Sequence, residues 1–339
     1  MKQTWWQRVW PLIKLGASAT LIGLLWYQGK LDFSALWLLS SSPWTIVLAV
    51  LFSTASYSLG ALRWIVLLRS QRIVLPLIWG HKVTYLSLYC NLVLPGGGMA
   101  GDAIRLAQVI RVAPQQRLEG FLSLFVDRAV GLYGMLFIAL LAILSNPDVV
   151  TDIGPLRLMA GVVLGAVLGI PVGAVVFYHL LHFLTEKAWF VRLLASGGRF
   201  GALLGRLMDI VRLYRNALPQ LLLALLLTVL LQGLLLSGLV LVAVSMELGS
   251  LTPLDYTFAT PWAWMANFLP LTPGGIGVGE ATFDQVCRWL ESTPSGAPYG
   301  TIFLMYRLLS MLGSFPGLVI FFFDRKEVQA VVREPENGF

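Results

Sequence analysis

Two similar stretches of the chain, Pro95-Gly-Gly-Gly-Met-Ala-Gly-Asp102 and Pro273-Gly-Gly-Ile-Gly-Val-Gly-Glu280, interrupt segments that are otherwise apolar. Each has a proline, glycines one, two and six positions after it, and an acid seven positions after it. Because proline and glycine disfavour the interior of a helix, we expect each stretch to break one. The apolar segments at 83–103 and 256–280 are therefore predicted to be interrupted helices. The residues expected to form the breaks are Pro95, Gly96, Gly97, Gly98 and Gly101 in the first stretch and Pro273, Gly274, Gly275, Gly277 and Gly279 in the second.

The rest of the 339-residue chain is also apolar, with 57% hydrophobic and 12% charged residues. A soluble domain usually carries about twice that charged fraction. Uncharged runs at 44–62, 158–178, 217–246 and 256–279 reach or exceed the roughly 18 residues that indicate a membrane span. This composition excludes a soluble globular protein and predicts an all-α polytopic membrane protein. The net charge of +7 is expected to follow topology rather than nucleic-acid binding, because cytoplasmic loops collect Lys and Arg.

Full membrane spans are expected in addition to the two interrupted segments. The six predicted spans lie at 9–27, 44–62, 121–145, 157–178, 218–245 and 299–323. Basic residues flank the first interrupted segment on both sides, at Lys82 and from Arg105 to Arg117, so we expect it to be a re-entrant hairpin from the cytoplasmic side. The second follows Glu247 and Asp255 and is expected to be a hairpin from the opposite face. Both termini are then expected in the cytoplasm, with the protein in the inner cell membrane.

An internal repeat relates the two halves of the chain. The prolines of the two stretches are 178 residues apart, and two later arginines, Arg128 and Arg307, are 179 residues apart. Each half reads as a span, a hairpin and a span, and the one helix between the halves makes the second enter from the other side. We therefore expect an inverted repeat, the plan by which many transporters present one central site to either face. The predicted boundaries within a single membrane domain of residues 1–339 are 44–145 for the first repeat, 157–178 for the linking helix, 187–216 for a cytoplasmic basic loop and 218–323 for the second repeat.

Charged residues inside the spans are the main candidates for a functional site. Irregular backbone at membrane depth is tolerated only where it is buried in protein or lines a wet cavity, and a helix that restarts there offers free N–H groups to a phosphate. Arg128 and Arg307 lie inside spans, where an ionised side chain normally faces the bundle interior. We interpret them as headgroup contacts. The alternative is a structural ion pair, with Asp127 or Asp102 for Arg128 and with Glu280 for Arg307. Asp127 and Arg128 are adjacent and are not expected to share a helix face.

Other polar residues near the breaks allow two interpretations each. Asp102 and Glu280 either stabilise the N-termini of the restarting helices or face the cavity as proton- or cation-responsive groups. Arg105 is either a cavity cation or a solvated cytoplasmic charge. Asn91 and Asn267 precede their prolines by four and six residues, so they do not align, and each either caps freed backbone or contacts a ligand.

Basic residues elsewhere are expected at the membrane surface. Arg63 and Arg157 lie at span ends and are predicted to extend toward the headgroups. Within the basic loop, arginine recurs at positions 192, 199 and 206 on one helical face. That spacing fits either attraction to an anionic lipid surface or a solvated cytoplasmic face.

The sequence indicates no cofactor. Cys90 and Cys287 lack the neighbouring ligands of a zinc site, and His179 and His182 lack further ligands. The glycine-rich stretches lack the lysine of a P-loop. We therefore expect neither a metal nor a cofactor.

Three segments carry a resemblance to a known family: Asn91 to Arg105, Phe125-Val-Asp-Arg128, and Leu269 to Glu280. They resemble the flippase-like transmembrane domain of lysylphosphatidylglycerol synthases, and the resemblance covers most of the chain. In full-length relatives this domain is joined to a soluble domain that transfers an amino acid from tRNA to phosphatidylglycerol. The sequence ends at Phe339, shortly after the last expected span, so a stand-alone domain is expected here.

The resemblance implies a lipid flippase or transporter rather than an enzyme. Its substrate would be a phosphorylated lipid, whether a phospholipid, an aminoacyl-lipid, a glycolipid or a polyprenyl-phosphate, that crosses through a central polar cavity. Two alternatives stay open: a membrane scaffold or partner of a lipid-modifying enzyme, and an enzyme that acts on a lipid headgroup within the membrane. The expected partners are the lipid substrate and an anionic lipid surface, with no nucleic acid. A lipid-modifying enzyme as partner and self-association of the chain are also left open.

Overall fold

The computed structural model describes residues 16, 19–93, 98–145, 147, 154–185, 187, 217–267, 272 and 275–323. The regular secondary structure of these residues is helical throughout. Several sequence predictions lie outside the described residues: positions 9–15, 17 and 18 of the first expected span at 9–27, nearly all of the basic loop at 187–216, both termini, and the break residues Pro95, Gly96, Gly97, Pro273 and Gly274.

The helices follow the same order on either side of one long helix, α7 (Gly154–Thr185). Before it lie η1 (Phe33–Ser41), α2 (Pro43–Ser70), α3 (Leu77–Val93), α4 (Gly98–Val112), η2 (Pro114–Gln116) and α5 (Arg117–Ser145). After it lie α10 (Leu218–Met246), α11 (Pro253–Ala266), α12 (Val278–Leu290), α13 (Tyr299–Gly313) and α14 (Phe315–Phe323). Each interrupted segment is thus two separate helices, as predicted, and these helices extend beyond the limits expected from the sequence.

Local sequence explains where several helices begin. Proline occupies the first turn of α2, α10 and α11, where its missing N–H costs no helical hydrogen bond. Thr252 and Asp255 form a reciprocal capping box at the start of α11, which satisfies two backbone donors that would otherwise lack partners.

Five helical segments in the described part of the chain are long and apolar enough to cross a membrane. They are Pro43–Ser70, Pro114–Ser145, Gly154–Phe177, Leu218–Met246 and Tyr299–Phe323. These five overlap five of the six spans expected from the sequence. The last consists of α13 and α14, which meet at Ser314.

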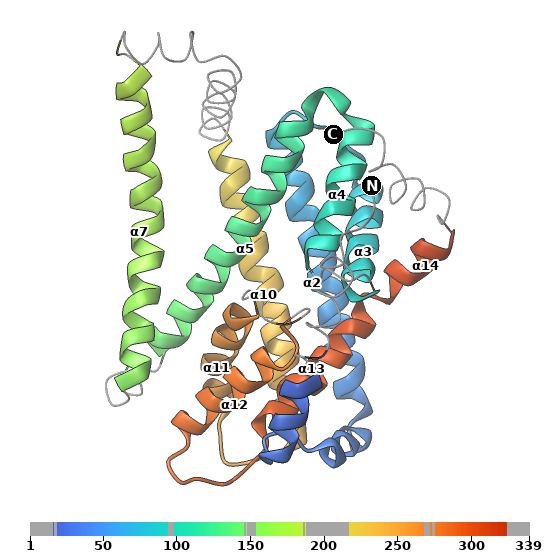
Figure 1. The fold of residues 1–339 in the computed structure, drawn as a ribbon, viewed down its shortest axis with the longest axis vertical. Coiled ribbons are helices and arrows are strands. Elements are labelled where there is room, and N and C mark those ends of the chain that lie inside the picture. Colours follow the sequence, from blue (N-terminus) through green and yellow to red (C-terminus); the bar gives the residue numbers. More distant parts are fainter. Residues whose placement is uncertain are drawn as a thin grey trace.

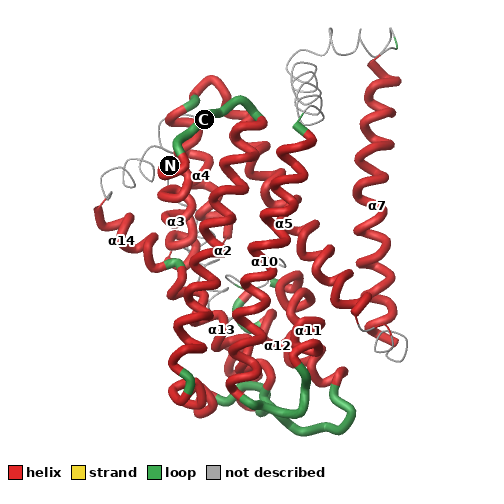
Figure 2. Tube along the Cα trace, turned by 180° about the vertical axis from the view of Figure 1, so that it is seen from behind, coloured by secondary structure: helices red, strands yellow, loops and turns green. Residues whose placement is uncertain are grey.

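The two pairs of short helices approach the bundle from opposite ends. Figure 1 shows α3 and α4 in the upper part of the molecule and α11 and α12 in the lower part, with α2, α5 and α10 running past both pairs. The view from behind in Figure 2 shows the same arrangement. α3 packs against α4, α11 packs against α12, and the most extensive helix pairing joins α2 to α10.

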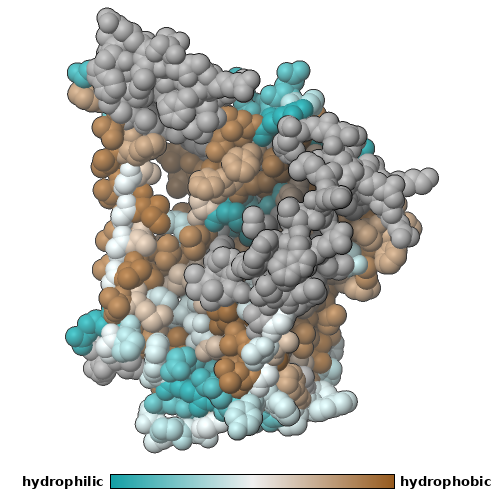
Figure 3. Space-filling view, viewed as in Figure 1, coloured by the Kyte–Doolittle hydropathy of each residue, from teal (hydrophilic) through white to brown (hydrophobic). Residues whose placement is uncertain are grey.

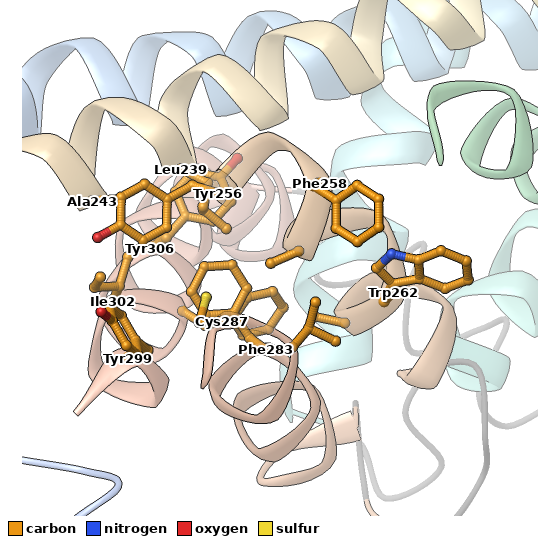
Figure 4. Close-up of a cluster of buried hydrophobic side chains, with 14 of the residues drawn as sticks. Leu239, Ala243, Tyr256, Phe258, Trp262, Phe283, Cys287, Tyr299, Ile302 and Tyr306 are labelled. Atoms are coloured by element: carbon orange, nitrogen blue, oxygen red, sulfur yellow. The ribbon is translucent and has the colours of Figure 1, made fainter. Parts of the chain in front are cut away.

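A large aromatic core holds the α11–α12 pair in place. Figure 4 shows side chains from α10, α11, α12 and α13 converging on this core. The Phe283 ring is fully buried and lies 6.3 Å from the Tyr256 ring and 5.4 Å from the Phe303 ring, measured between centroids. A smaller cluster, which includes Trp64 and Val109, packs between the helices of the first half.

The membrane-facing surface is clearest on α7. This helix stands to one side of the bundle (Figure 1) and packs on α5, where the Tyr133 hydroxyl donates a hydrogen bond to the Val167 carbonyl at 3.0 Å. Its other faces are exposed and apolar, for example at Leu158, Val162 and Leu168. Brown, hydrophobic side chains accordingly cover much of the coloured surface between the two ends of the molecule in Figure 3, and teal side chains form a patch at its lower end.

Polar contacts at that lower end tie the N-terminal part of the chain to the second half. The Asp32 N–H donates to the Thr301 hydroxyl at 2.8 Å, and the Lys30 ammonium lies 3.6 Å from the buried carboxylate of Asp284. Arg288, one turn along α12, donates to the same carboxylate at 2.8 Å.

The aromatic core gives a stability prediction. Replacing Phe283 by alanine removes a fully buried ring, a change that costs about 3–5 kcal/mol in well-packed cores. We expect Phe283→Ala to lower the unfolding temperature in detergent micelles, followed by tryptophan fluorescence. Phe177→Ala, on the exposed face of α7, should leave that temperature nearly unchanged. Equal effects of the two variants would contradict the assignment of this core.

Candidate functional site

Two asparagines hold the helices that restart after the breaks. The Asn91 side-chain oxygen accepts a hydrogen bond from the Gly101 N–H at 2.6 Å, a first-turn donor of α4 that has no partner within the helix. In the second half, the Asn267 side chain lies against Gly275 and Gly279, where an added Cβ would meet its oxygen. The backbone-capping interpretation of Asn91 is therefore confirmed.

The two asparagines do not align in the sequence, but they contact corresponding glycines in the structure. Asn91 contacts Gly101 and Asn267 contacts Gly279, and each of these glycines stands six residues after its proline. The distance from each asparagine to its proline does not reveal this correspondence, because the connection between α11 and α12 is longer than that between α3 and α4.

Glu280 both stabilises the N-terminus of α12 and forms an ion pair with Arg307, the two structural roles that the sequence allowed. Its carboxylate accepts from the Gly277 N–H at 2.7 Å at the start of α12 and from the Arg307 Nε at 2.7 Å. Arg307 also donates to the Asn267 side chain and to the Gly275 carbonyl, both at 3.3 Å. The Glu280 side chain is fully buried and that of Arg307 is 13% exposed. Gly275 and Gly277, with φ of 71° and 86°, provide the left-handed backbone that this turn requires.

Asp102 and Arg128 form the corresponding pair in the first half. The Arg128 Nε and Nη2 atoms lie 2.9 and 2.8 Å from one Asp102 carboxylate oxygen. This pair is more open than its counterpart, because 46% of the Arg128 side chain and 28% of the Asp102 side chain are exposed. The ion pairs that the sequence left as an alternative are therefore present in both halves.

Asp127 joins two further arginines in the first half. The Arg63 Nε donates to one Asp127 oxygen at 2.8 Å, and the Arg105 Nη1 lies 3.4 Å from the other. Arg63 also donates to the Thr228 hydroxyl of α10 at 3.1 Å. Asp127 and Arg128 thus have different partners on different faces of α5, as predicted.

Arg105 is a buried cation. It is 9% exposed, its Nε donates to the Ser87 hydroxyl at 3.1 Å, and its guanidinium lies 5.0 Å from the centre of the Trp64 ring. These contacts exclude the alternative of a solvated cytoplasmic charge. The Trp64 ring adds a cation–π contact in a site that is largely withdrawn from water.

Arg63 corrects a further prediction, since it does not extend toward the membrane surface. The sequence reading ended the second span at residue 62 because Arg63 is charged, but α2 continues to Ser70. Arg63 is therefore inside a helix, where a charged side chain needs a partner. The acid at Asp127 was a usable signal for that partner. No sequence pattern indicated the Thr228 contact.

The two halves gather different numbers of charged side chains. We call Arg63, Arg105, Arg128, Asp102 and Asp127 the first-half cluster, and Arg307 with Glu280 the second-half pair. The named residues are three arginines and two aspartates in the first half, and one arginine and one glutamate in the second.

The difference follows from the residues that occupy corresponding positions of the two halves, which are 178 or 179 residues apart. The positions that correspond to Asp127 and Arg105 in the second half are Tyr306 and Phe283. Both are buried in the aromatic core. The second half therefore has apolar packing where the first half has charges.

Among the residues that the structure describes, no three His, Cys, Asp or Glu side chains come close enough to hold a metal ion. The charged groups that the described arrangement brings together are guanidinium groups, which can bind an anion, and carboxylates, which pair with them.

Long apolar helices whose internal charges are held in ion pairs define a polytopic helical membrane protein. A family model described as the transmembrane region of lysylphosphatidylglycerol synthase matches residues 12–317. The chain belongs to this family, which relates it to lipid handling. Comparisons with curated proteins and with solved structures gave no match.

The close approach of Asn267 to α12 gives a prediction about the second break. An alanine Cβ at position 279 would meet the Asn267 oxygen and lie 2.8 Å from the Phe303 ring. We expect Gly279→Ala to cost about 1–3 kcal/mol, as overpacking of a filled site does, and to lower the unfolding temperature in detergent. The matched control is Gly165→Ala on α7, where a Cβ meets open space. An unchanged unfolding temperature for Gly279→Ala would contradict the packing described here.

Proposed function

We propose that the protein moves a lipid with an anionic phosphate headgroup between the two leaflets of the membrane, without changing the lipid chemically. The observation that carries the proposal is the group of three guanidinium groups in the first-half cluster. They come from α2, α5 and α4, and α4 is the helix that restarts after the first break. Guanidinium groups bind phosphate through charge-assisted hydrogen bonds, so a lipid phosphate is a suitable ligand for them.

The arrangement of the short helices supports this proposal. α3–α4 and α11–α12 lie toward opposite ends of the molecule (Figure 1), and the helix order α2–α5 is repeated in α10–α13. We propose that these pairs are the re-entrant hairpins of an inverted repeat. The headgroup then passes between the hairpins while the lipid tails stay in the bilayer.

The proposed orientation follows the charges of the loops. We place the end of α4 at the cytoplasmic face of the inner cell membrane, with both termini on that side, and the loop after α12 on the opposite face. The membrane-lipid substrate is the partner that this proposal requires.

Arg128 is the most accessible guanidinium of the first-half cluster and is expected to meet the headgroup. The test uses purified protein in liposomes that contain fluorescent phosphatidylglycerol, with dithionite quenching to report the exchange of leaflets. We expect Arg128→Gln to slow exchange about tenfold or more, since a hydrogen bond to a charged group contributes about 1.5–3 kcal/mol. Arg111→Gln, at an exposed position near the end of α4, is the control for loss of an arginine. Equal rates for wild type and Arg128→Gln would remove Arg128 from the site, and no exchange by the wild type would contradict the function.

The orientation gives a separate prediction. Cysteines introduced by Arg111→Cys and Ser292→Cys occupy exposed positions, whereas native Cys90 and Cys287 are buried. With an impermeant thiol reagent added to intact cells, position 292 should be labelled, and position 111 should react only after the cells are opened. Labelling of position 111 from outside would overturn both the first hairpin and the inverted repeat.

A further inference from the structure

One face of α5 combines an exposed arginine with exposed apolar side chains. Phe121, Phe125 and Leu132 are 53%, 64% and 39% exposed, and 46% of the Arg128 side chain is exposed. These four residues follow one another at intervals of four, three and four positions, so they lie on the same side of the helix. We call them the α5 stripe.

Arg128 lies deep in the membrane span. The apolar segment that contains α5 runs over Pro114–Ser145, and Arg128 stands close to its middle. Phe125 before it and Leu132 after it on the α5 stripe are exposed, which indicates that this side of the helix faces lipid tails rather than water. An ionised side chain at this depth needs polar or charged neighbours. Asp102 is one of them, and 28% of its side chain is exposed beside the arginine.

The corresponding face of α13 is closed. The positions that match the α5 stripe at the offset of 179 residues are Gly300, Leu304, Arg307 and Met311. Gly300 is buried, Leu304 and Met311 are partly buried, and the Arg307 side chain is 13% exposed. An arginine that is open toward the lipid, with exposed apolar side chains on both sides of it, is therefore a feature of the first of these two helices.

A phospholipid matches both parts of the α5 stripe. A guanidinium binds phosphate oxygens through charge-assisted hydrogen bonds, and exposed apolar side chains contact acyl chains. We propose that the α5 stripe binds one phospholipid from the surrounding bilayer, with its phosphate on Arg128 and its tails against Phe121, Phe125 and Leu132.

This inference rests on the proposed transport function, for which it names the place where the lipid first binds. The lipid enters from the side of the protein, so its tails stay in the hydrocarbon core. A phosphate at Arg128 has already moved from the membrane surface toward the middle of the bilayer, which is the first stage of a crossing.

The test uses purified protein in liposomes that contain a trace of phosphatidylglycerol with a diazirine in one tail. After illumination, mass spectrometry of the peptides locates the attached lipid. Diacylglycerol with the same diazirine tail lacks the phosphate and is the reference probe. The reference surface is α7, where Val162, Leu168 and Val175 are 62%, 60% and 57% exposed. We expect the ratio of phosphatidylglycerol to diacylglycerol labelling to be about tenfold higher on the α5 stripe than on α7, the factor that one hydrogen bond to a charged group supplies.

Two variants assign the preference to Arg128. Arg128→Gln should lower the ratio on α5 to the value found on α7, whereas Arg111→Gln, at an exposed position near the end of α4, should leave it unchanged. Labelling of α7 in the same sample shows that each variant is inserted in the bilayer. Equal ratios on the two helices of the wild type, or a ratio on α5 that survives Arg128→Gln, would overturn the phospholipid site.

The dithionite assay on the same liposomes separates this inference from the proposed function. Exchange between leaflets without a raised labelling ratio on α5 would overturn the entry site and leave transport intact. A raised ratio that depends on Arg128, without exchange between leaflets, would overturn transport and leave the α5 stripe as a phospholipid-binding site.

Discussion

The rest of the arrangement depends on the ion pair made by the carboxylate that stands seven residues after the proline of each helix break. Breaking a helix inside an apolar bundle frees backbone N–H groups, and an arginine on the following long helix adds a charge. Glu280 satisfies both demands at once, through the Gly277 N–H and the Arg307 guanidinium. In the first half two residues meet these two demands. Asn91 caps the restarting helix, and Asp102 binds Arg128.

The two halves also differ in the side chains that surround these ion pairs. In the second half, aromatic rings fill the positions that correspond to Arg105 and Asp127, and the remaining ion pair is closed off from solvent. In the first half the same positions carry charge, and three arginines meet two aspartates. One half therefore has an aromatic interior with one ion pair, and the other gathers several charged side chains.

The main features could be predicted from the sequence because they repeat or follow a simple period. The five described spans, the two breaks, the Arg–acid pairs and the separate faces of Asp127 and Arg128 all follow from such patterns. The contact of Arg63 with Thr228 could not be predicted, because it depends on how far α2 continues and on how it packs against α10. The match between Asn91 and Asn267 was also hidden, since it arises from the path of the chain between helices rather than from sequence spacing.

The replacement of Arg105 and Asp127 by Phe283 and Tyr306 has a consequence for how such a chain could be assembled. A protein built from two copies of the first half would bury these two charged side chains twice, and one built from two copies of the second half would bury aromatic rings in both places. Neither half can stand in for the other.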